Sequence, residues 1–98
     1  MTDKLTLTYD ANKLCVAERL AGRPLAAMLA ELESDEGASL TTLRALYAAG
    51  MINVSYPYLP AGPWHAEMAG RAIDRHGTAR CAEAVGKGLA AYFDRGAA

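Results

Sequence analysis

Cysteine is scarce in this 98-residue sequence, and the two that occur, Cys15 and Cys81, lie far apart. They form no C-x-x-C pair, so their spacing supports neither a zinc ribbon nor a redox dithiol. Lone thiols of a cytoplasmic chain stay reduced. We therefore expect both cysteines to be small, buried apolar side chains.

The sequence also lacks an excess of charge of one sign and an unbroken apolar run. Its formal net charge is −1, which does not favour a nucleic-acid-binding surface. The longest stretch without a formal charge, residues 45–66, is interrupted by three prolines and cannot be read as a membrane span. No basic segment precedes an apolar one at the N-terminus, so we expect no signal peptide and a cytoplasmic location.

Alanine is abundant and β-branched residues are few, which favours helix over strand. Only residues 5–9 alternate apolar and polar side chains, so they are predicted to form a strand or to lie extended on the helices. The predicted fold is a single, mainly α domain over residues 1–98, a small bundle of about five short helices with one short N-terminal β-strand. The helices are expected to begin near residues 11, 24, 40, 63 and 79. Residues 1–10 are assigned to the extended N-terminal strand, 51–62 to an irregular aromatic loop and 96–98 to a frayed tail.

Helical spacing of the apolar residues predicts one shared core. Asp10 and Gly22 are expected to cap the first helix, Pro24 to be the first residue of the second, and Gly50 to end the third. The core is predicted to contain Leu14, Leu25, Met28, Leu29, Leu43, Leu46, Tyr47, Ile73, Val85 and Leu89.

One short motif suggests catalysis, His65-Ala66-Glu67, because H-x-E opens the signature of zinc nucleobase deaminases. That chemistry needs two further thiolates at P-C-x-x-C spacing, and only Cys81 follows. The two polar residues are therefore read as part of the first turn of a helix. We expect no enzyme, no metal and no cofactor.

A DNA-binding regulator is a weak alternative. The segment that would serve as a recognition helix, residues 40–49, carries one basic residue, Arg44, and follows an acidic turn. The remaining basic residues of the C-terminal half alternate with acids, as on an ion-paired helix surface.

The aromatic loop is the predicted partner-binding surface. Its candidate contact residues are Tyr56, Tyr58, Leu59 and Trp64, because Tyr and Trp bury large areas at low entropic cost. These side chains are equally well explained as a cover over the domain's own core. The acidic segment from Glu31 to Glu36 is read as a solvated turn and is the second choice for a partner surface.

Several segments together resemble the small tail assembly chaperones of long-tailed phages, including the version found in gene transfer agents. The N-terminal part matches the pattern F-D-x-N-A-L-C-x-L-E-x-x-x-G-x-S-L, residues 39–51 match s-x-x-x-L-R-a-L-l-y-A-G-L, and a later helix matches t-x-E-x-A-G-x-L-I-x-x-x-G. The matching positions are Asp10, Asn12, Leu14, Cys15, Glu18, Gly22 and Leu25, then Glu67, Ala69, Gly70, Ile73 and Gly77. Two departures are an N-terminal hairpin reduced to one strand and a longer, more aromatic loop over residues 53–64.

The resemblance implies a non-enzymatic role in the host cytoplasm. Such chaperones coat the tail tape-measure protein and recruit tail-tube subunits, so these two proteins are the expected partners, with self-association also possible. Nucleic acid and membrane are not expected partners. The alternative from the same resemblance is a structural component of the phage tail or of the head–tail connection.

Overall fold

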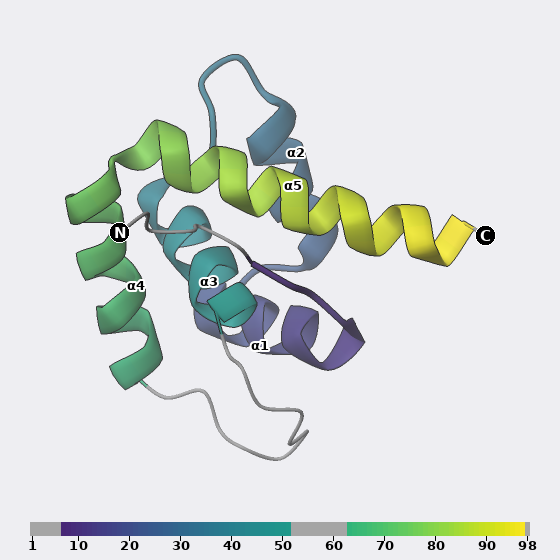
Figure 1. Cartoon of the computed structure of the whole chain (residues 1–98), viewed down its shortest axis with the longest axis horizontal. Helices are drawn as coiled ribbons and strands as arrows, with labels where there is room; N and C mark the ends of the chain where they lie inside the picture. Colours follow the sequence, from purple (N-terminus) through teal and green to yellow (C-terminus); the bar gives the residue numbers. More distant parts are fainter. Residues whose placement is uncertain (1–6, 52–62, 98) are drawn as a thin grey trace, which may run out of the picture.

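A computed structural model describes residues 7–51 and 63–97, with the side chains at 63–64 and 95–97 left out (Figure 1). The described chain is mainly helical and contains no strand, which confirms the predicted helical class. Its elements are α1 (Ala11–Ala21), α2 (Leu25–Glu33), α3 (Leu40–Met51), α4 (Pro63–His76) and α5 (Thr78–Ala97). In the described part, no helix combines the length and the apolar character that crossing a membrane requires.

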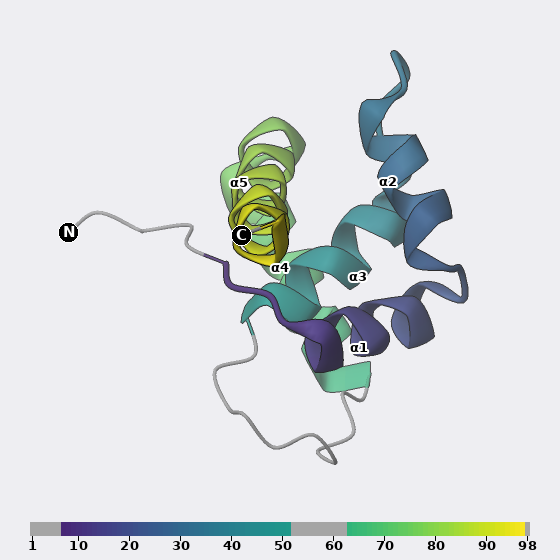
Figure 2. The same ribbon diagram turned by 90° about the vertical axis from the view of Figure 1, so that its right-hand side faces the viewer.

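Helix α3 is the centre of the fold and packs against α1, α4 and α5. Figure 2 shows α5 and α2 on opposite sides of α3. Nearly every residue of α3 from Thr42 to Gly50 is buried, as expected for a helix surrounded by neighbours. Its alanines at 45, 48 and 49 are small enough to let these neighbours approach closely.

Most of the predicted core is confirmed. The buried members of the predicted set are Leu14, Met28, Leu43, Leu46, Tyr47, Ile73, Val85 and Leu89. Leu25 and Leu29 are only partly buried and pack against the edge of this cluster. The reason is that α2 is a short peripheral helix, in which Met28 is the buried residue.

The ends of α1 and the start of α2 follow the sequence signals with one correction. Asp10 caps α1, because its carboxylate accepts a hydrogen bond from the Lys13 N–H at 2.8 Å, and Gly22 ends α1 with φ 69°. Pro24 is not the first residue of α2 but the residue before it. Proline has no side-chain acceptor, so Glu18 of α1 caps α2 instead and accepts the Leu25 N–H at 2.7 Å.

The described part of the N-terminal segment lies along α3 and α5 without forming a strand, while residues 1–6 lie outside the described residues. The predicted alternation holds, with Leu7 and Tyr9 buried and Thr8 exposed. The Thr8 N–H donates to the Gly50 carbonyl at 3.2 Å, and the Tyr9 hydroxyl donates to the Leu46 carbonyl at 2.6 Å. Burial raises the pKa of Tyr9, so the phenol stays protonated as a donor.

Two helical glycines form the slot in which this segment lies. Gly50 does not end α3 as predicted, because the helix continues to Met51. A Cβ atom at Gly50 would lie 2.7 Å from the Tyr9 hydroxyl, and one at Gly88 would lie 2.7 Å from the Leu7 carbonyl oxygen. Glycine at both positions is therefore required for close approach of the segment rather than for turn geometry.

Two further predictions, one on the cysteines and one on the C-terminal tail, are wrong in part. Cys81 is buried, and burial raises the pKa of its thiol. Cys15 is exposed on α1, because the buried positions of that helix are Leu14 and Ala17. Helix α5 extends through Ala97, so the part of the predicted tail at 96–97 is helical, and Ala98 lies outside the described residues.

Candidate partner-binding groove

The partner-binding residues predicted from the sequence fall mostly outside the described structure. Tyr56, Tyr58 and Leu59 lie in the segment 52–62, which is not described. Trp64 is the second residue of α4, and its side chain is not described either. Their role as contact residues therefore stays a prediction.

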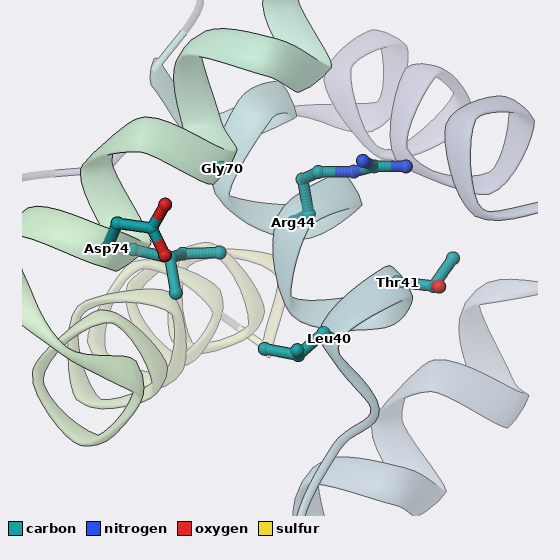
Figure 3. Close-up of a pocket in the computed structure, with 6 residues that line it drawn as sticks. Leu40, Thr41, Arg44, Gly70 and Asp74 are labelled. Carbon is teal, nitrogen blue, oxygen red and sulfur yellow. The ribbon is translucent and has the colours of Figure 1, made fainter.

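A different surface presents the geometry of a binding site, an open groove of about 250 Å³ between α3 and α4 (Figure 3). Its lining residues are Leu40, Thr41 and Arg44 from α3 and Gly70, Ile73 and Asp74 from α4. Leu40 is 63% exposed, whereas Ile73 is 7% exposed and belongs to the core. The groove thus joins an exposed apolar side chain to the edge of the core, and such grooves accept apolar side chains of partner helices.

Helical spacing predicts that Leu40 is buried, but its side chain is exposed. It lies one turn before Leu43 on the same apolar stripe of α3, which is why the spacing predicts burial. In the described part of the chain, no neighbouring side chain covers the apolar stripe at this first turn, because α4 contributes Gly70 to the facing wall of the groove.

Gly70 keeps the groove open. A Cβ atom at this position would meet only the Cδ of Arg44, at an ordinary contact distance of 3.7 Å, and its φ is not positive. A glycine inside a helix costs about 0.5–1 kcal/mol relative to alanine. Gly50 and Gly88 are explained by contacts within the chain, whereas no contact of the described residues requires glycine at 70.

Opposite charges stand on the two walls of the groove. Arg44 projects from α3 and Asp74 from α4, on different sides of the groove in Figure 3. Both side chains are exposed, and neither forms an ion pair with another residue of the described ranges. The two charges are therefore available to orient a partner that carries an acid and a base.

The first turn of α3, which supplies Leu40 and Thr41 to the groove, is fixed from behind by Glu31. One carboxylate oxygen of Glu31 accepts the Ser39 N–H at 2.9 Å, and the other accepts the Thr42 hydroxyl at 3.0 Å and pairs with Arg23. The backbone hydrogen bond from Ser39, followed by those from the Thr42, Ser39 and Arg23 side chains, lowers the pKa of Glu31 to about 2. The expectation of a solvated acidic turn is thus wrong for this residue.

This network predicts a pH dependence of folding. The pKa of Glu31 is about 2 in the folded chain against an ordinary value of 4.5, so the unfolded state binds more protons between these values. The stabilisation by Glu31 is complete above about pH 4.5 and is lost as the pH falls towards 2. In urea titrations, Glu31→Gln should lower stability at pH 7, and its difference from the wild type should shrink at low pH. A difference independent of pH would contradict this account.

The residues of the H-x-E motif lie apart from the groove lining. His65 is half-buried and Glu67 exposed near the start of α4, where Glu67 accepts a hydrogen bond from Arg71 at 2.7 Å. The Cys81 sulfur lies 3.9 Å from the Ala72 carbonyl oxygen. Within residues 7–51 and 63–97, no three His, Cys, Asp or Glu side chains gather in a group that could hold a metal ion.

The sequence patterns place Ile73 in the core and Arg44 on a possible recognition helix, but they do not predict that these residues line one groove. The sequence signal that could have indicated the groove is Gly70, a glycine that lies inside a helix and not at a turn. Comparison of the chain with family models, curated proteins and solved structures found no match.

Proposed function

We propose that this chain is a non-enzymatic tail assembly chaperone of a long-tailed phage, prophage or gene transfer agent. It binds the tape-measure protein and tail-tube subunits in the host cytoplasm during tail assembly. The observation that carries the proposal is the groove between α3 and α4, with an exposed leucine, a glycine in its wall and a charge on each side.

The groove suits one turn of an amphipathic helix. Leu40 and Ile73 offer an apolar contact, and Gly70 leaves room for a side chain of the client. A single contact of this size binds weakly. Many copies bound along one long helical client gain strength from multivalency, as coating a tape-measure protein requires.

The residues behind the resemblance act in this chain mainly as structural supports. Asp10 and Gly22 cap the two ends of α1, Glu18 caps α2, and Leu14 is in the core. They fix the ends of α1, which packs against α3, and its connection to α2. The matching N-terminal pattern thus supports the proposal at the level of fold, while Gly70 and Ile73 of the later pattern line the groove.

Co-expression with segments of a tape-measure protein and with a tail-tube protein from the same genome tests the proposal. Gly70→Leu fills the groove and should weaken binding of a client helix by about thirtyfold or more, the effect of losing an interface anchor. Ala26→Leu is the control, because Ala26 is exposed on α2, a helix that contributes no residue to the groove. Equal binding by both variants would remove the groove from the proposal.

Particle composition separates the chaperone from the alternative, a structural component of the tail or head–tail connection. A chaperone is absent from finished particles, whereas a tube, terminator or connector subunit remains at a fixed copy number. Mass spectrometry of purified particles measures this directly. Detection at the copy number of a ring would replace the chaperone by the structural role.

A further inference from the structure

We infer that, when no client occupies it, the groove between α3 and α4 receives the C-terminal half of α5 from a second copy of this chain. In this contact Phe93 enters beside Leu40 and Gly70, and Asp94 faces Arg44. The inference rests on the proposed function, since it assigns an occupant to the same groove.

Phe93 is presented as a projecting apolar side chain. It continues the helical spacing of the buried Leu89, but it is 43% exposed. The last turns of α5 extend past the other helices (Figure 1). The Phe93 ring packs edge to face on Tyr92, with centroids 5.3 Å apart, and Tyr92 packs against the core cluster. Phe93 is therefore held in place before any partner arrives, which lowers the entropic cost of binding.

The other residues on the Phe93 face of α5 are small. Gly86 and Ala90 share this face by helical spacing, and both are exposed. A Cβ atom at Gly86 would meet nothing within 4 Å, so no contact in the described part of the chain requires glycine there. One large ring beside two small residues allows the helix backbone to approach the groove while the ring enters it.

The charges on α5 and in the groove are complementary. Asp94 and Lys87 are exposed, lie on one face of α5 and are two turns apart, about 10 Å along the axis. The groove carries the opposite pair, Arg44 on α3 and Asp74 on α4. A helix that lies across the groove with Asp94 towards Arg44 brings Lys87 to the side of Asp74.

Geometry requires that the contact join two molecules. In Figure 1 the C-terminal end of α5 and helix α4 lie at opposite sides of the same domain. The Phe93 ring of one chain therefore cannot enter its own groove. Because the two contacting surfaces differ, each copy retains a free groove at one end and a free Phe93 at the other, and copies add head to tail.

Sedimentation velocity of the purified chain over a range of concentrations tests the inference. The wild type should show a mass that rises with concentration beyond a dimer. Phe93→Ser and Gly70→Leu should each weaken self-association by about thirtyfold or more, with helical content and melting temperature retained. An equimolar mixture of the two variants should form dimers and stop there, because it contains one intact groove and one intact Phe93 per pair.

Charge-reversal variants provide a second, independent test of the contact. Arg44→Glu and Asp94→Arg should each weaken association, and the double variant should regain it, whereas Arg80→Glu, near the other end of α5, should change nothing. A wild type that stays monomeric, or single variants that associate like the wild type, would overturn the inference. Client binding measured with the Phe93→Ser chain, whose groove is intact, is a separate result. Loss of client binding in this variant would reject the proposed function. A wild-type chain that binds the client but stays monomeric would reject only the second-copy contact.

Discussion

Leu43→Ala should lower the free energy of unfolding by about 2–5 kcal/mol, as large-to-small substitutions in a protein core do. Leu43 is 3% exposed and lies on α3, the helix that contacts α1, α4 and α5. Removing its side chain loses buried apolar surface and leaves a cavity. The buried helices around it cannot close that cavity without disturbing their own contacts.

Leu40→Ala is the matched control. It removes the same side chain one turn earlier on α3, where the leucine is 63% exposed. Its effect on stability should stay within about 0.5 kcal/mol, as for most surface substitutions. Urea denaturation of both variants at pH 7 provides the measurement. Similar losses for the two would show that the burial assigned to α3 is wrong.

Gly88→Ala should destabilise the fold by about 1–3 kcal/mol, the usual cost of overpacking. Helix propensity alone predicts the opposite, a gain of roughly 1 kcal/mol for replacing glycine inside a helix. The added methyl group would lie 2.7 Å from both the Leu7 carbonyl oxygen and the Tyr9 ring. The N-terminal segment would have to move, which disturbs the hydrogen bond from the Tyr9 hydroxyl to Leu46.

Gly86→Ala, two residues earlier on α5, separates packing from propensity. A methyl group there meets nothing within 4 Å, so this variant should be about 0.5–1 kcal/mol more stable than the wild type. Thermal and urea denaturation of the two variants should give opposite signs. A gain in stability for Gly88→Ala would mean that Leu7 and Tyr9 do not occupy the slot between α3 and α5.

The sequence by itself determined the helical class, the approximate starts of the five helices and most of the core. These features depend on local chemistry. Asp10 caps α1 with its own carboxylate, Gly22 adopts the positive φ that ends it, and the spacing of Leu43, Leu46 and Tyr47 follows the helical repeat. Neighbours in the sequence carry this information, so it can be read without knowing how the helices pack.

Only the tertiary structure decided which equally apolar residues are covered. Leu40 and Phe93 continue the stripes of their helices, yet both are exposed, because a helix repeat does not show where the neighbouring helix ends or has a glycine. Glu31 reads as part of an acidic run, and its contacts to Ser39 and Thr42 arise only when the start of α3 folds back beside α2. The groove has the same origin, since its two walls belong to helices about thirty residues apart in the chain. Contacts between distant segments depend on packing, which local spacing does not encode.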